Sequence, residues 1–227
     1  MCYSLKPPLR LGTSRVSTNY LYGYVEDAPS SEIAKRILAH VNKEATSAFE
    51  FKEGFPKIEN GFGAIKKKVP ALKEMAENGI FSLVITDLDT AECPPSLIKQ
   101  WCGDSGGDNL SLPLGLIFRV AVREIESWIL ADREALSGFL GIPAANFEAS
   151  PDDLSDPKQH LMNVLRKKGR KKWHREMVPK TASASIGPLY NEKLCRFVRN
   201  DWDPGRAQVR SPSLKRSIQA FKKVCAL

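Results

Sequence analysis

The stretch LVITDLDT, residues 83–90, is an apolar run that ends in two carboxylates, Asp87 and Asp89, one residue apart. Such a run predicts a buried strand whose carboxyl end lies at the edge of a sheet, where open α/β sheets bind their ligands. If the backbone stays extended through Asp89, the two carboxylates share one face and repel each other unless a cation lies between them. The alternative is a solvated turn after the strand, since short motifs often occur by chance.

Apolar runs and helical patterns alternate around this strand. Further strands are expected at 20–25 (YLYGYV), 49–52 and 116–122 (LIFRVAV), and helices after a Ser30 cap and at about 61–78, 94–101 and 126–140. Strands that alternate with helices predict an α/β fold with a mainly parallel sheet flanked by helices.

Composition limits the class of protein. The chain has 227 residues, 42% of them hydrophobic, which is enough for a substantial core. No window approaches 18 uninterrupted apolar residues and the opening has no apolar signal core, so we expect a cytoplasmic protein with no membrane partner. The five cysteines form no CxxC pair and the three histidines have no ligand spacing to them, which argues for reduced thiols and against structural zinc.

Charge divides the chain into two unlike parts. Residues 151–227 hold 18 Lys and Arg against 7 Asp and Glu, a net charge of +11, whereas residues 1–150 hold 16 against 19, a net charge of −3. Amphipathic helices are expected at 188–198 and 212–224, the second capped by Ser211 or Ser213. We therefore predict a catalytic core at 1–150 and a basic, mostly helical extension at 151–227.

Acidic residues recur where the predicted strands end. Glu26 follows the first strand, Glu124 lies two residues beyond LIFRVAV, and Glu126 comes soon after. Adjacent carboxyl ends of parallel strands would bring Glu26, Asp87 and Asp89 together, with Glu124 and Glu126 as further candidates. Such a cluster is unfavourable unless it binds a hard cation, and Mg²⁺ (or Mn²⁺) accepts carboxylates while it retains waters. Each lone glutamate could instead be a surface charge or a helix N-terminal acid.

The basic part contains one dense cluster, RKKGRKKWHR at 166–175. Its candidate nucleic-acid-binding residues are Arg166, Lys167, Lys168, Arg170, Lys171, Lys172, Trp173 and Arg175. Clustered cations neutralise phosphates with release of counterions, and a tryptophan can stack on an unpaired base. The alternatives are a solvated loop or a contact for an acidic protein.

The acids together resemble a known arrangement. Glu26 after a first strand and Asp87-x-Asp89 after a later one resemble the Toprim catalytic site of topoisomerases, DnaG-type primases and overcoming-lysogenization-defect nucleases, although Asp27 stands where Toprim proteins usually have glycine. Four further segments are similar to an uncharacterised Toprim-like family, whose members are commonly encoded beside ABC- or SMC-type ATPases in bacterial defence islands. These are Arg123–Asp132, Asp156–Lys158, Ile186–Asn191 and Trp202–Leu214. The resemblance implies a Toprim-like fold, Mg²⁺, cleavage of nucleic-acid phosphodiesters, antiviral defence and an ATPase partner.

The expected chemistry is metal-assisted hydrolysis of DNA or RNA. Asp87 and Asp89 would hold one or two metal ions, Glu26 would complete the shell or act as general base, and Glu124 would bind a second metal. No Walker A motif occurs, so ATP-driven control would come from a partner. Two alternatives stay open: a non-catalytic nucleic-acid or partner-binding subunit, and a haloacid-dehalogenase-type phosphatase, whose DxD is normally followed by Thr or Val where this chain has Ala91.

Overall fold

The computed structural model describes residues 18–45, 47–59, 61–103, 112–181 and 184–226. Its strands are β1 (Thr18–Val25), β2 (Ala48–Phe51), β3 (Lys57–Ile58), β4 (Ser82–Asp87) and β5 (Leu116–Ala121). Its α-helices are α1 (Ala28–Val41), α2 (Phe62–Lys66), α3 (Val69–Glu77), α4 (Pro94–Cys102), α5 (Glu126–Ala131), α6 (Arg133–Leu140), α7 (Pro157–Lys168), α8 (Lys172–Met177), α9 (Tyr190–Asn200), α10 (Pro204–Ala207) and α11 (Pro212–Cys225), with 3₁₀ turns η1 (Ala144–Asn146) and η2 (Pro151–Asp153). The predicted α/β class is confirmed.

The sheet is parallel and has the order β2-β1-β4-β5. The short strand β3 pairs with the carboxyl end of β1, on the side away from β4. The register places Val25 opposite Ile85 and Asp87 opposite Ala121. The residues that follow β1, β4 and β5 therefore meet at one edge of the sheet.

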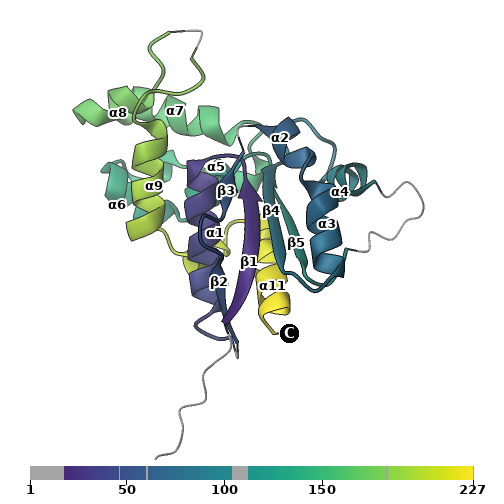
Figure 1. The fold of residues 1–227 in the computed structure, drawn as a ribbon. Coiled ribbons are helices and arrows are strands. Elements are labelled where there is room, and N and C mark those ends of the chain that lie inside the picture. Colours follow the sequence, from purple (N-terminus) through teal and green to yellow (C-terminus); the bar gives the residue numbers. More distant parts are fainter. Residues whose placement is uncertain (1–17, 46, 60, 104–111, 182–183, 227) are drawn as a thin grey trace, which may run out of the picture.

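Alternation along the strands explains the layers. In β4, Leu83 and Ile85 belong to one core cluster and Val84 to another. Successive side chains of a strand point to opposite faces, so an uninterrupted apolar strand needs cover on both sides. Helices α2, α3 and α4 cover one face, and α1 and α11 cover the other (Figure 1).

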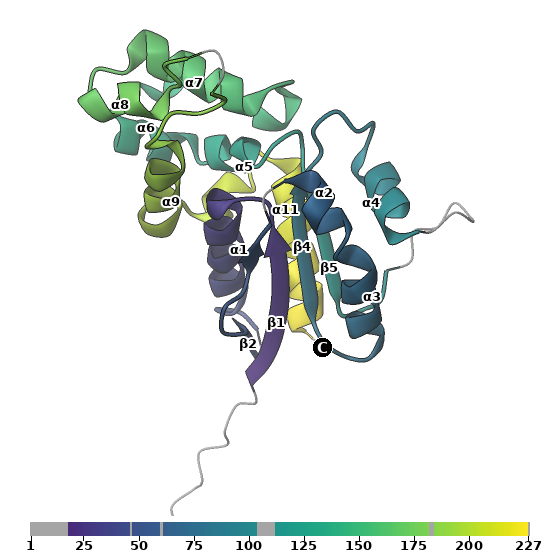
Figure 2. The same ribbon diagram turned by 45° about the horizontal axis from the view of Figure 1, so that its top comes forward.

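The basic C-terminal part shares its core with the strands. Leu214, Ile218 and Phe221 of α11 are fully or almost fully buried in the same cluster as Leu21 of β1. Helix α11 thus lies against the sheet, while α7 and α8 extend beyond the carboxyl ends of the strands (Figure 2). The predicted boundary at residue 150 marks a change of charge, and the hydrophobic core is continuous across it.

Several predicted boundaries differ from the structure. The helix expected at 61–78 is two helices, because Pro70 has no N–H to donate within a helix but fits the first turn of α3. The run at 126–140 breaks at Asp132, whose backbone is not helical and whose buried carboxylate accepts two hydrogen bonds from the Arg206 guanidinium. Helix α1 is capped by Asp27, and Ser30 donates to that cap instead of forming one. Ser211 caps α11 as predicted.

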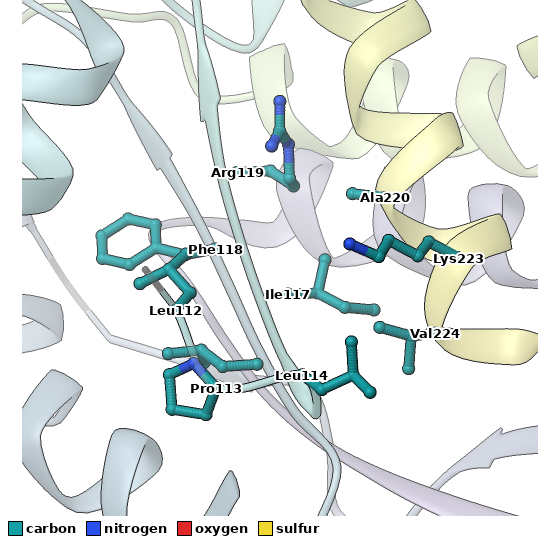
Figure 3. Close-up of a pocket in the computed structure, with 10 residues that line it drawn as sticks. Leu112, Pro113, Leu114, Ile117, Phe118, Arg119, Ala220, Lys223 and Val224 are labelled. Atoms are coloured by element: carbon teal, nitrogen blue, oxygen red, sulfur yellow. The ribbon is translucent and has the colours of Figure 1, made fainter. Parts of the chain in front are cut away.

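A groove of about 360 Å³ lies beside the edge strand β5, between it and α11 (Figure 3). Leu114 and Ile117 line it from the sheet side, and Lys223 and Val224 line it from α11. It lies towards the amino end of β5, so it is at the opposite end of the strand from the acidic residues. No helix in the described part of the chain is both long and apolar enough to cross a membrane.

Candidate active site at the carboxyl edge of the sheet

Glu26 and Asp87 come together at the ends of the neighbouring strands β1 and β4. Glu26 Oε1 accepts hydrogen bonds from the Thr86 hydroxyl and from the Asp87 backbone N–H, the latter at 3.0 Å. Asp87 Oδ1 accepts the Ile125 backbone N–H at 2.8 Å. One oxygen of each carboxylate is therefore fixed by the protein, and no donor of the described residues is bonded to the other oxygen.

The surroundings of both carboxylates favour the protonated form. Burial raises the pKa of Glu26, an effect that the bonds from Thr86 and Asp87 oppose and the charge of Asp89 adds to. Burial, followed by repulsion from Glu126 and Glu26, raises the pKa of Asp87 well above its usual value. A cation bound between such groups would stabilise their charged forms.

Asp89 is not placed as the extended strand would place it. Strand β4 ends at Asp87, and Asp89 has a φ of 47°, in the left-handed region. The Asp89 N–H donates to the Arg123 carbonyl at 2.9 Å, and the Arg123 guanidinium donates to the carbonyls of Asp89 and Ala91. The condition for Asp87 and Asp89 to share a strand face is therefore not met, because the backbone is no longer extended at Asp89. Asp89 is exposed but still close enough to act on the charge of Glu26.

Glu124 and Glu126 are neutralised from within the protein. Glu124 Oε2 accepts the Lys158 backbone N–H at 2.8 Å, and its Oε1 accepts the Lys158 ammonium at 3.1 Å. The same ammonium lies 3.7 Å from Glu126 Oε1. Burial lowers the pKa of Lys158, but the charges of Glu126, Glu124 and Asp87 outweigh it and the net shift is upward. Lys158 thus occupies the place where the sequence predicted a second metal.

Glu126 is the most deeply buried acid of the group. It is fully buried at the start of α5, and its Oε1 accepts the Tyr190 hydroxyl at 2.9 Å. Its Oε2 has no hydrogen-bond partner. Burial raises the pKa of Glu126 to about 7, even though Lys158 opposes that shift. The carboxyl group can therefore gain or lose a proton near neutral pH.

The donors present fit a cation held by two carboxylates. Within the described residues, no group of three or more His, Cys, Asp and Glu is arranged to hold a metal ion. Mg²⁺ is commonly held by one or two carboxylates together with waters and substrate phosphates. Glu26 and Asp87 match that donor set, because each has an oxygen that no described donor uses. A site that also includes Glu124 and Glu126 does not match, since Lys158 already compensates these two.

The basic run at 166–175 spans the end of α7 and the start of α8. Its exposed members are Arg166, Lys167, Lys168, Arg170, Lys171, Lys172 and Arg175. The Lys171 ammonium reaches the Phe139 carbonyl at 3.2 Å and lies 5.3 Å from the centre of the Trp173 ring. Trp173 is partly buried and packs against Phe139. The ring thus has a packing role, and base stacking by Trp173 stays a prediction.

Sequence analysis missed three residues that shape the site: Thr86, Lys158 and Tyr190. Thr86 lies within LVITDLDT, residues 83–90, but a threonine is not part of a carboxylate motif. Lys158 follows Asp156-Pro157, a pair typical of a helix start, and Asp156 does cap α7 by accepting the Gln159 N–H. Tyr190 lies in the segment Ile186–Asn191 that resembles the Toprim-like family, but nothing local predicts its contact with Glu126, which is 64 residues away in sequence.

No protein-family model matches the chain, and no curated protein or solved structure is significantly similar to it.

Proposed function

We propose that the chain is a Mg²⁺- or Mn²⁺-dependent hydrolase that cleaves nucleic-acid phosphodiesters. The observation that carries this proposal is the pair of partly buried carboxylates, Glu26 and Asp87, at the ends of the neighbouring strands β1 and β4. The pKa values of both carboxylates are raised, and each has an oxygen that no described donor uses. A cation bound to these oxygens would stabilise the charged forms. The net charge of +11 on residues 151–227 supports a polyanionic substrate.

Each residue of the site can be given a chemical role in phosphodiester hydrolysis. A metal ion bound there would polarise the phosphodiester and stabilise the leaving oxygen. The Ile125 N–H holds the Asp87 carboxylate in one orientation, and the Thr86 hydroxyl does the same for Glu26. Glu26 is the candidate general base toward water, and burial raises its pKa. Lys158 adds positive charge beside Asp87.

The biological setting follows from the sequence resemblance. We propose that the hydrolase is the effector of a bacterial anti-phage system and that a partner ATPase controls it. Support for this part comes from the four segments that resemble the Toprim-like family.

The test is cleavage by the purified full chain. Plasmid DNA, single-stranded DNA and tRNA are incubated with Mg²⁺, with Mn²⁺ and with EDTA. We expect metal-dependent products that Asp87→Asn abolishes and that Glu26→Gln reduces by about 100-fold or more, the usual range for loss of a general base. Glu192→Gln is the matched control, because Glu192 is an exposed surface acid paired with Lys193.

Other outcomes would favour the alternatives. Turnover of p-nitrophenyl phosphate without cleavage of any nucleic acid would support a phosphatase. Binding of nucleic acid that is unaffected by Asp87→Asn, with no cleavage under any condition, would support a non-catalytic subunit.

A further inference from the structure

A second groove lies next to the carboxylates, lined by α7 on one side and by residues 179–181, 184 and 185 on the other. Its volume is about 530 Å³. Glu124 and Lys158 form the wall that it shares with the candidate active site, and Arg166, Lys180 and Ser185 contribute to the rest of its lining. A ligand in this groove would therefore adjoin a substrate bound at the carboxylates.

The charge of the groove is positive once its internal pairs are counted. Glu124 is held by the backbone N–H and the ammonium of Lys158. Asp156, also in the lining, accepts the Gln159 N–H at 2.7 Å as the cap of α7. Both acids of the lining are thus engaged with donors of the protein.

Two cations of the groove have no acidic partner. Arg166 donates to the uncharged Asn163 Oδ1 at 3.1 Å, and neither Arg166 nor Lys180 forms an ion pair within the described part of the chain. Both side chains are exposed. A guanidinium fork, an ammonium and the Ser185 hydroxyl together form a donor set suited to a phosphate group.

We propose that this groove is a phosphate subsite, in which Arg166 and Lys180 bind a phosphate ester next to the one at Glu26 and Asp87. The inference rests on the proposed function and sharpens it, because it selects Arg166 from the basic run and adds Lys180, which lies outside that run. The phosphate can belong to a nucleic-acid strand or to a free nucleotide, and the experiment separates these sources.

The experiment measures binding without turnover. Fluorescence anisotropy in EDTA follows a 3′-labelled, 5′-phosphorylated hexathymidylate, with thymidine 5′-monophosphate and inorganic phosphate as competitors. We expect Arg166→Ala and Lys180→Ala each to weaken binding about tenfold, because each removes a hydrogen bond between charged groups. The double variant should also lower the log–log salt slope by about 1.4, which corresponds to two lost contacts on a single strand.

The matched control is the double variant Lys43→Ala, Lys223→Ala. It removes the same amount of charge at two exposed residues that belong neither to the basic run nor to the lining of the groove. We expect its affinity to stay within about threefold of wild type, because distant surface charges are screened by salt. Both competitors should displace the oligonucleotide from wild type and from this control.

The outcomes separate the subsite from the proposed function. If the Arg166, Lys180 double variant binds the oligonucleotide like wild type, or loses no more affinity than the control, the subsite is wrong. Metal-dependent cleavage that Asp87→Asn abolishes would then still support the hydrolase. If instead wild type binds the monophosphate in a manner that depends on Arg166 and Lys180 but does not bind the oligonucleotide, the subsite stands for a small phosphate ester and the nuclease proposal fails.

Discussion

Two pairs of acidic residues at the same edge of the sheet differ in how their negative charge is compensated. Glu124 and Glu126, after β5, share the ammonium of Lys158 at 3.1 and 3.7 Å. Among the described residues, the hydrogen-bond donors to Glu26 and Asp87 are neutral: the Thr86 hydroxyl and two backbone N–H groups. Lys158 forms ion pairs with the first pair, whereas it acts on Asp87 through its charge without an ion pair in the described part of the chain.

The difference shows that acidic strand ends are not equivalent as metal candidates. A lysine from α7 compensates the pair after β5, so an added cation would gain less there. At the ends of β1 and β4, burial raises the pKa of Asp87, and repulsion from Glu126 and Glu26 adds to that shift. We therefore propose that a cation binds between Glu26 and Asp87. The following predictions test that comparison.

The largest effect is expected from Lys158→Met. The change leaves the fully buried carboxylate of Glu126 and the partly buried one of Glu124 without a counter-ion. We expect a loss of about 3 kcal/mol in the free energy of unfolding at pH 7, near the lower end for a broken buried pair. The ammonium is partly exposed, with 28% of the side chain accessible, which limits the loss. Urea unfolding measures it, and Lys222→Met, which breaks the surface pair with Glu44, is the control and should cost about 0.5 kcal/mol or less.

The same variant should recover stability in acid. Protonation of Glu126 removes the uncompensated charge, so the deficit should be smaller at pH 5 than at pH 8. A deficit that does not change with pH would mean that Lys158 acts by packing, and the contrast between the two acid pairs would lose its basis.

The second prediction concerns Mg²⁺ itself. An ion that binds only the folded state stabilises it by about 2.7 kcal/mol at a concentration 100 times its Kd. We expect thermal unfolding of wild type to shift upward with Mg²⁺, and Asp87→Asn to abolish the shift. Glu124→Gln should leave most of it. Equal losses in both variants would show that the two acid pairs bind metal together.

The third prediction uses the pKa of Glu126. A folded-state pKa of about 7, raised from 4.5, means that the protonated form favours folding. The contribution of Glu126 to wild-type stability should therefore be fully present below pH 4.5 and decline as the pH rises from 4.5 to 7. Glu126→Gln keeps an acceptor for Tyr190 and removes this titration, so its stability relative to wild type should rise by on the order of 2 kcal/mol between pH 5 and pH 8. Urea unfolding at both pH values checks this, and parallel pH profiles would contradict it.

The smallest effect is expected from Asp89→Asn. Asp89 is exposed and its backbone, not its carboxylate, holds the turn. We expect the free energy of unfolding to change by no more than about 0.5 kcal/mol and the Mg²⁺ shift to persist. A complete loss of that shift would restore Asp89 as a direct ligand and move the site away from the pair at β1 and β4.

Local sequence was enough to predict the class of the fold. Strands β1, β2, β4 and β5 begin and end within about two residues of the predicted limits, because uninterrupted apolar runs such as LVIT must be covered on both faces. Helix limits were less certain where a proline or a buried carboxylate interrupts the pattern, as at Pro70 and Asp132.

The sequence by itself determined that acids would gather at the carboxyl edge of a parallel sheet, since strand direction and residue order are local properties. Only the tertiary structure decided which acids remain uncompensated. Lys158 lies 34 residues from Glu124 in sequence and Tyr190 lies 64 residues from Glu126, yet both contact these acids directly. Charge compensation acts over a few ångströms of space, and the packing of α7 and α9 beyond the strands sets which groups come within that distance.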